Sequence, residues 1–426
     1  MLDTIIGLAA LVFLVLLIRY VLQLTSERVR VSSITKRGFE LEADLLRARI
    51  DQITDQLRLD FKSEKAFWNG FRKFQIILKV KETKDVTSFY LSPHDGKHLP
   101  PFLPGQYLTF KLNIPGRTKP LIRCYSLSDS PNHPEYYRVT IKRLPPPKGV
   151  PGAPPGLGSN FFHHSLKERD IVDVKAPSGH FHLDTTQTTP VVLISGGVGV
   201  TPILSMLNAI TEKGFRREFF PRETWLFLGF RNGSDHIMKE HLENVVNKNK
   251  NVSLHVCYSR PCESDILGRD FHHPRRISGN LLRQVLPSNN YEFYICAPPK
   301  MIESLRQDLA GWGVPKKNIH YEAFNSDTVR KLVAGEITET GSSIKITFTK
   351  SQKTLPWNPA AGSILAFAEE NGISLESGCR AGNCGTCLTA IKRGLVTYVV
   401  EPGIQPEARS CLTCISIPKT DLTLDG

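Results

Sequence analysis

Five of the nine cysteines lie within the last 48 residues of the chain. Cys379, Cys384 and Cys387 have C-x4-C-x2-C spacing, and Cys411 and Cys414 follow downstream. This spacing is typical of a plant-type 2Fe-2S cluster, whose anionic sulfides need a glycine-rich loop that turns its N–H groups toward them. The two C-x2-C pairs would also suit structural zinc, but zinc leaves Cys379 unexplained. The pattern therefore favours iron–sulfur ligation in a reducing compartment.

A run of glycines in the middle of the chain indicates a second site. Gly196, Gly197, Gly199 and Thr201 belong to the run GGVGVTP, which follows the apolar stretch Val191–Ser195. A buried strand that ends in glycines and leads into a helix lets the backbone approach an anion at the helix N-terminus. The run is not the full G-x-G-x-x-G fingerprint, but it predicts a pyrophosphate-binding loop.

The elements that must position these residues divide the chain into several parts. Residues 68–185 contain short β-rich runs separated by Pro and Gly, which indicate an antiparallel barrel: Gln75–Lys81, Val86–Leu91, Gln106–Leu112 and Tyr136–Arg143. Residues 186–325 alternate strands with helical stretches, as in a parallel α/β sheet: Val191–Ser195, Trp225–Gly229, Ser253–Tyr258 and Tyr291–Cys296. Residues 326–342 form a polar linker. Residues 343–426 carry a strand at Ile344–Thr349, a helix near Ile364–Asn371 and the cysteine loop.

The N-terminal part differs in kind from the rest. Residues 1–24 are almost entirely apolar, with no charge between Ile5 and Ile18, which predicts a single transmembrane helix if Arg19 reaches the interface. Basic residues follow this segment, so the catalytic domains are expected in the cytoplasm. The alternative is an apolar helix packed on a partner protein. Residues 25–67 have apolar side chains three and four apart, which predicts a helical stalk.

Charge and composition limit the possible partners. The chain has 426 residues, of which 40% are hydrophobic and 22% are charged, and this excludes wholesale disorder. A net charge of +13 favours an acidic partner or an anionic membrane surface. Basic residues are scattered and are not interleaved with aromatics, so we expect no nucleic-acid binding.

The cysteine loop resembles a known family. The run Ser377–Cys387 is similar to the cluster loop of ferredoxin domains fused to oxygenase reductases. In that family the fourth ligand precedes a strand of the form Cys-Ile/Val-Ser, which matches Cys414-Ile415-Ser416. The resemblance implies a β-grasp (α+β) domain, with Cys411 as a spare thiol and four cluster ligands: Cys379, Cys384, Cys387 and Cys414.

Three further segments resemble the flavin site of the ferredoxin–NADP reductase superfamily. The tetrad Arg123-Cys124-Tyr125-Ser126 matches its R-x-Y-S motif. The resemblance implies that Arg123 pairs with flavin phosphate, Tyr125 packs on the isoalloxazine ring and Ser126 approaches N5. Val139–Lys142 matches the second flavin-contacting strand, which implies contacts from Val139 and Lys142. The segment Gly156–Asn160 matches the pyrophosphate-binding G-x-x-S segment and favours FAD over FMN, through Gly156, Gly158, Ser159 and Asn160.

The nicotinamide site has its own matches. Cys296-Ala297-Pro298 resembles the family's Cys-Gly-Pro motif beside the nicotinamide, with Ala297 in place of the usual glycine. The alternative for Cys296 is a buried thiol at a strand end. Glu322-Ala323-Phe324 resembles the terminal segment that closes over the flavin, through Glu322 and Phe324. Ser259-Arg260 resembles the pair that binds the 2′-phosphate in relatives that use NADPH.

Together these resemblances imply an electron-transfer reductase. NAD(P)H would reduce FAD, and the flavin would pass single electrons to the 2Fe-2S cluster. Tyr125, Ser126 and Cys296 would position the reactants, because hydride transfer needs no general base. The acceptor would be a separate, membrane-bound oxygenase, desaturase or similar protein. Two alternatives are a redox sensor or docking subunit without turnover and a quinone-linked respiratory subunit, although relatives of the latter type carry the ferredoxin domain first.

Overall fold

The computed structural model describes residue 19 and residues 68–118, 120–146, 154–211, 221–324, 344–378, 380, 382, 385–399, 402 and 406–426. The chain divides into two units, Met1–Lys65 and Ala66–Gly426. The expected anchor (1–24) and stalk (25–67) lie outside the described residues, apart from Arg19. Among the described residues, no helix combines the length and apolar character needed to cross a bilayer.

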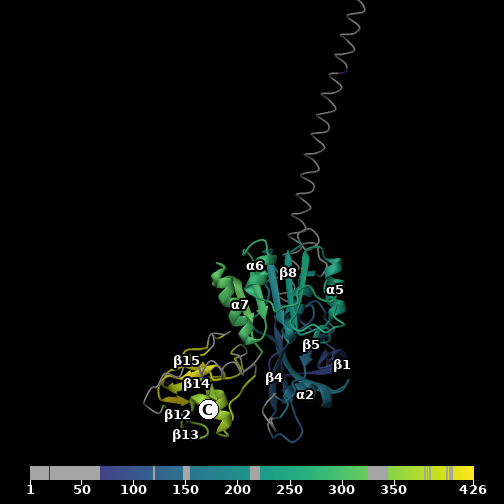
Figure 1. Cartoon of the computed structure of the whole chain (residues 1–426). Coiled ribbons are helices and arrows are strands. Elements are labelled where there is room, and N and C mark those ends of the chain that lie inside the picture. Colours follow the sequence, from purple (N-terminus) through teal and green to yellow (C-terminus); the bar gives the residue numbers. More distant parts are fainter. Residues whose placement is uncertain are drawn as a thin grey trace, which may run out of the picture. The chain divides into compact units, whose positions relative to one another are not determined.

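Six antiparallel strands form the first domain of the second unit (Figure 1). They are β1 (Arg72–Thr83), β2 (Val86–Pro93), β3 (Tyr107–Leu112), β4 (Leu121–Ser126), β5 (Tyr137–Lys142) and β6 (Ile171–Ser178), in the order β4-β3-β6-β1-β2-β5. An antiparallel bridge between Leu127 and Val139 joins the two edges and closes the barrel. Closure places β4 beside β5, so the two strands expected to contact a flavin become neighbours. A short helical segment, α2 (Leu157–Asn160), lies between β5 and β6 in the sequence.

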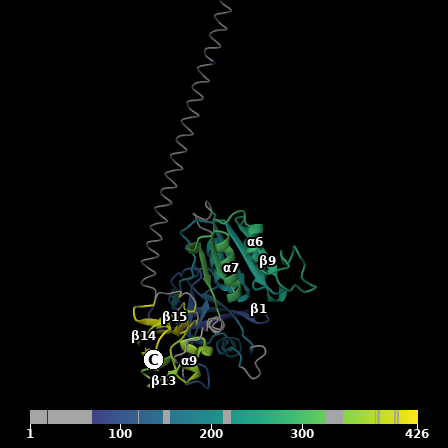
Figure 2. The same cartoon turned by 60° about the vertical axis from the view of Figure 1, so that its left-hand side comes forward.

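A parallel five-stranded sheet forms the second domain. Its strands are β7 (Val191–Gly196), β8 (Thr224–Phe230), β9 (Val252–Tyr258), β10 (Glu292–Cys296) and β11 (Ile319–Glu322), in the order β11-β10-β7-β8-β9. The central strand β7 is apolar on both faces because helices cover both. Figures 1 and 2 show α6 (Gly279–Val285) and α7 (Pro299–Gly311) together on one face. The helices α3 (Val200–Thr211) and α5 (Lys239–Lys248) pack on the other.

The third domain is a small mixed sheet with a helix across it. Its main strands are β12 (Lys345–Phe348), β13 (Lys353–Pro356), β14 (Leu388–Arg393), β16 (Ser410–Leu412) and β18 (Leu422–Leu424), in the order β13-β12-β18-β14-β16. A separate pair joins β15 (Val396–Tyr398) to β17 (Ser416–Pro418). β12 and β18 are parallel, and helix α9 (Ile364–Glu370) packs its apolar side chains against both. This α+β arrangement agrees with the expected β-grasp domain.

Candidate functional site

Two of the four expected cluster ligands lie among the described residues, and they meet. The sulfur atoms of Cys387 and Cys414 are 3.1 Å apart, and both residues are buried. Cys414 follows β16, and Cys387 precedes β14, the antiparallel partner of that strand. Two convergent, buried thiols fit ligation of one iron ion of a 2Fe-2S cluster. Cys379 and Cys384 lie outside the described residues.

Cys411 occupies a different environment from Cys414. It belongs to strand β16 and is fully buried in the core that α9 forms with β12 and β18. Cys387 and Cys414 instead belong to a second apolar cluster with Leu365 and Ile415. Burial raises the pKa of the Cys411 thiol to about 12, so it remains protonated at neutral pH. This environment agrees with a spare thiol rather than a ligand.

The backbone of the cysteine loop is shaped by residues in the left-handed region. Gly382 has a φ of 78°, which strains any L side chain, and a Cβ atom there would also lie 2.4 Å from Ile415 Cδ1, so glycine is strongly favoured. Arg380 also has a positive φ, 56°. Its side chain is tied to helix α9, because Nη1 donates to Glu369 Oε2 at 2.9 Å and Nη2 to Oε1 at 2.5 Å. This bidentate pair holds the loop on the helix.

Strand β4 presents the expected flavin-binding side chains. Phe110 and Phe162 hold the Tyr125 ring edge-on, with centroids 5.7 and 5.2 Å away. Burial lowers the pKa of the Arg123 guanidinium, which donates to Ile122 O at 2.7 Å. A half-buried, preoriented guanidinium fits a phosphate group. Ser126 is buried at the end of the strand.

The segment α2 packs directly on β4 (Figure 1), and glycine makes this possible. A Cβ atom at Gly158 would lie 2.9 Å from Arg123 Cγ and 3.0 Å from Tyr125 Oη. The expected phosphate segment thus lies against the expected flavin motif. The Ser159 hydroxyl donates to Gly156 O at 3.1 Å, so its proton is engaged within the turn. Asn160 Nδ2 donates to the same carbonyl at 2.9 Å. Both side chains therefore shape the loop in this structure.

Strand β5 holds the remaining expected flavin contacts. Val139 is fully buried in the barrel core, so its side chain faces away from any ligand and only its backbone is available. Lys142 is half-buried at the strand end, where it pairs in register with Val86. Of the two expected contacts on this strand, Val139 can therefore offer only its backbone, whereas Lys142 can offer its side chain.

The glycine loop and the cysteine motif of the nicotinamide site come together. A Cβ atom at Gly199 would lie 2.0 Å from Cys296 O, and one at Gly196 would lie 2.7 Å from Pro298 Cδ. Neighbouring parallel strands β7 and β10 end here, so their loops share one edge of the sheet. Around Gly197, which has a φ of 59°, no atom lies within 4 Å of an added Cβ. This open glycine edge fits the close approach of a pyrophosphate.

The remaining expected contacts, to the nicotinamide nucleotide and to the flavin, lie at the same sheet edge or in its core. Cys296 is fully buried, and burial raises the pKa of its thiol, so the group remains a neutral packing surface. Glu322 is buried in register with Cys296 on β11, and Phe324 is 40% exposed. Ser259 follows β9, and Arg260 beside it is exposed. The hydroxyl of Thr201 donates to Val198 O at 3.1 Å and stabilises the loop.

One group of polar residues was not found from the sequence. Asp129 and Arg138 of the barrel form a buried ion pair that connects to Asn208 and His241 of the parallel sheet domain. The residues are up to 112 positions apart and belong to no motif. Only the folded chain brings them together.

Family models match three parts of the chain. The oxidoreductase FAD-binding domain matches residues 73–183, and the oxidoreductase NAD-binding domain matches residues 193–307. The 2Fe-2S iron-sulfur cluster binding domain matches residues 346–419. The cofactor set expected from the sequence, FAD, NAD(P)H and a 2Fe-2S cluster, is confirmed by these matches.

Known proteins resemble the chain over different lengths. A flavohemoprotein of Bacillus cereus is 41% identical over 261 residues, which are 61% of this chain and 62% of the relative. A flavohemoprotein of Halalkalibacterium halodurans is 36% identical over 289 residues, 68% of this chain and 67% of the relative. The chain thus spans about three fifths of the length of the Bacillus relative.

A solved structure of phthalate dioxygenase reductase resembles a larger part of the chain. It has a TM-score of 0.52 and 22% sequence identity, and the match covers 84% of this chain and 98% of that one. That protein is described as a modular structure for electron transfer from pyridine nucleotides to 2Fe-2S. At this identity the likeness is one of fold.

Proposed function

Because this chain belongs to the ferredoxin–NADP reductase superfamily, with its domains in the order of phthalate dioxygenase reductase, we propose that it passes electrons from NAD(P)H to a separate acceptor protein. The observation that carries the proposal is the buried Cys387–Cys414 pair, with its sulfur atoms 3.1 Å apart. This cysteine pair lies in the same chain as the glycine loop at Gly197, whose open backbone suits a dinucleotide. A bound flavin accepts a hydride and releases single electrons, which a 2Fe-2S cluster then takes up.

The residues of the chain have distinct tasks in this proposal. Arg123 would bind flavin phosphate, and Tyr125 would pack against the flavin ring and keep water from that face. The open backbone at Gly197 would admit the nucleotide pyrophosphate. Cys387 and Cys414, with Cys379 and Cys384, would hold the cluster. None of these tasks needs a proton to move at a side chain.

The acceptor in this proposal is a terminal oxygenase, a desaturase or a similar non-heme iron protein. The support is the domain order shared with phthalate dioxygenase reductase, in which the 2Fe-2S domain follows the FAD-binding and NAD-binding domains. We further propose that the acceptor is bound to a membrane, with this chain anchored beside it. The support is the apolar run in residues 1–24 and the basic residues that follow it.

Steady-state reduction of cytochrome c by the purified protein tests this function. We expect rapid turnover with NAD(P)H, and loss of most of it in Cys387→Ser, because a single-electron acceptor draws from the cluster. Ferricyanide reduction, which the flavin supports directly, should persist in the same variant. A wild-type protein that oxidises neither NADH nor NADPH with either acceptor would instead favour the sensor or docking alternative.

A further inference from the structure

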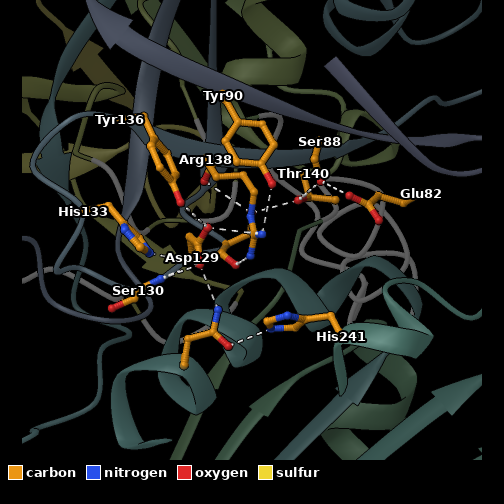
Figure 3. A network of polar contacts seen from close by, with 12 residues as sticks. Glu82, Ser88, Tyr90, Asp129, Ser130, His133, Tyr136, Arg138, Thr140 and His241 are labelled. Carbon is orange, nitrogen blue, oxygen red and sulfur yellow. Dashed lines mark hydrogen bonds and ion pairs between the residues drawn. The ribbon is translucent and has the colours of Figure 1, made fainter. Parts of the chain in front are cut away.

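A buried polar network begins in the flavin barrel with an ion pair (Figure 3). Arg138 Nη1 lies 3.2 Å from Asp129 Oδ2, and the two side chains are 7% and 11% exposed. Arg138 also donates to the backbone oxygen of Ser128 and, at 3.4 Å, to Tyr90 Oη. Among the described residues, the partners of Arg138 all belong to the barrel, so the Asp129 carboxylate has a fixed position within that domain.

Two hydrogen bonds in series lead from this carboxylate into the nucleotide-binding domain. Asn208 Nδ2 on α3 donates to Asp129 Oδ1 at 2.9 Å. His241 Nε2 on α5 lies 2.9 Å from Asn208 Oδ1. A carboxylate and an amide oxygen only accept, so the Asn208 amide has one possible orientation and His241 must carry its proton on Nε2. At this crossing from the barrel to the nucleotide-binding domain, each of the two hydrogen bonds therefore has one donor and one acceptor.

Helix α3 connects the polar network to the glycine loop expected to bind the nucleotide. It begins at Val200, directly after the glycine loop, and Asn208 lies about two turns further along. Asp129 follows the flavin motif by three positions, after Ser126. The hydrogen bond between Asn208 and Asp129 thus joins the helix that carries the nucleotide loop to the strand end that carries the flavin motif.

The packing of α3 supports a rigid connection. All its residues from Val200 to Ile210 are buried, although a helix on a sheet usually exposes one face. Val86 and Phe181 of the barrel belong to the same apolar cluster as this helix. A Cβ atom at Gly105 of the barrel would lie 2.7 Å from Met206 Cε, so the two surfaces are in close contact. The helix is therefore packed between the sheet and the barrel.

We propose that Asn208, held by His241, is a positioning residue that sets the register between the nucleotide loop and the flavin motif during hydride transfer. The inference rests on the proposed function, since it concerns the step from NAD(P)H to flavin. Hydride transfer requires a fixed donor–acceptor geometry, and a misplacement of about 1 Å can slow such a step roughly a hundredfold. Loss of the hydrogen bond leaves the buried Asp129 carboxylate without its partner on α3, so the helix shifts slightly against the barrel while the shared apolar packing holds the two domains together.

Anaerobic stopped-flow reduction of the flavin in the full-length protein separates positioning from binding. We expect Asn208→Leu to lower the limiting rate of flavin reduction roughly tenfold or more, with little change in the Kd for NAD(P)H. His241→Leu should act in the same direction. His241→Gln should restore the wild-type rate, because its amide can donate to Asn208 Oδ1.

A matched control is a second hydrogen bond to the Asp129 carboxylate. Tyr136→Phe removes a 3.3 Å hydrogen bond to Asp129 Oδ2 from within the barrel, so it should change thermal stability but not the limiting rate. Equal slowing in Tyr136→Phe and Asn208→Leu, or a His241→Gln variant as slow as His241→Leu, would overturn the inference. If Asn208→Leu does not fold, the comparison of His241→Leu with His241→Gln tests the inference by itself. A wild type whose flavin no nucleotide reduces would overturn the proposed function itself.

Discussion

Cys411 and Cys414 are three positions apart, yet their side chains enter different apolar clusters. Cys414 meets Cys387, whereas Cys411 packs beneath helix α9. We therefore predict that Cys414→Ser abolishes the visible absorption and EPR signal of the 2Fe-2S cluster, while Cys411→Ser keeps both. Iron analysis of the two purified variants is the measurement. The reverse result, or a wild type that contains zinc and no iron, would show that the ligands are assigned incorrectly.

Arg260 offers a test of nucleotide choice at the residue scale. It follows β9 at the sheet edge where the nucleotide is expected, and it is exposed. A guanidinium there can form charge-assisted hydrogen bonds to a ribose 2′-phosphate, worth about 1.5–3 kcal/mol. We predict that Arg260→Ala lowers kcat/KM for NADPH tenfold or more and leaves NADH nearly unchanged. Equal losses for both nucleotides, measured in parallel steady-state assays, would exclude this role.

His236 makes stability depend on pH. Its ring stacks on Phe230, Nδ1 lies 2.9 Å from Tyr258 Oη, and burial lowers its pKa from 6.5 to about 4. Above pH 6.5 the histidine is neutral in both states. Between pH 6.5 and 4 the unfolded chain takes up a proton that the folded protein does not, so the free energy of unfolding falls as pH falls. The loss from this group is at most roughly 3 kcal/mol.

A non-titrating variant checks that assignment. His236→Gln keeps a polar group beside Tyr258 but binds no proton. Thermal unfolding of the two proteins between pH 7 and 4 should show a smaller decline in Tm for the variant. Parallel declines would mean that other groups, such as His255, whose pKa burial also lowers to about 4, cause the effect.

Individual site residues were predictable only where a motif carries them. The convergence of Cys387 with Cys414 follows from the Cys-Ile-Ser match. The hydrogen bonds of Ser159 within its own turn do not, because they depend on how the Gly156 carbonyl is turned. The Asp129–Asn208 bond has no local signal at all, since it depends on the packing of two domains.

At the scale of elements, the loop after β7 and the end of β10 are held together by a glycine. A Cβ atom at Gly199 would lie 2.0 Å from Cys296 O and 2.7 Å from Cys296 C, both backbone atoms that cannot rotate away. We predict that Gly199→Ala destabilises the protein by about 1–3 kcal/mol and raises the KM for NAD(P)H. Calorimetry and steady-state kinetics measure the two effects.

Gly311 provides the matched control for that substitution. It ends helix α7, and an added Cβ there meets no atom within 4 Å. Gly311→Ala should therefore stabilise the helix by up to about 1 kcal/mol and leave the KM unchanged. If both alanine variants raise the KM equally, backbone crowding at β10 is not the cause.

The parallel sheet was easier to predict than the barrel, for a physical reason. Buried parallel strands such as β7 are continuous apolar runs. Strand β4 instead carries Arg123 and Tyr125, which are half-buried because a ligand edge needs polar groups, so its sequence lacks a strand pattern. β6 was missed as well, although its burial alternates, because two charged residues and a proline interrupt its apolar side chains in the sequence between Ile171 and Ser178. Two of six barrel strands thus appear only in the structure.

At the scale of the whole molecule, the sequence predicts that the N-terminal segment tethers the protein to a membrane. We predict that deleting residues 1–30 releases a soluble protein that still oxidises NAD(P)H with ferricyanide, because the three cofactor domains begin later in the chain. Electron delivery to a membrane-bound acceptor should fall, since a tether raises the effective concentration. Fractionation of cells that express both forms is the measurement. A truncated protein that stays with the membranes would place the anchor elsewhere.

The order of electron flow through the molecule is the central claim, and anaerobic rapid mixing with NAD(P)H tests it most directly. Flavin absorbance and the EPR signal of the cluster can be followed in one experiment with freeze-quenched samples. We predict that the flavin is reduced first and that the reduced cluster appears afterwards, at the expense of fully reduced flavin. In Cys387→Ser the flavin phase should remain and the cluster signal should be absent. A cluster that is reduced before or without the flavin would contradict the account.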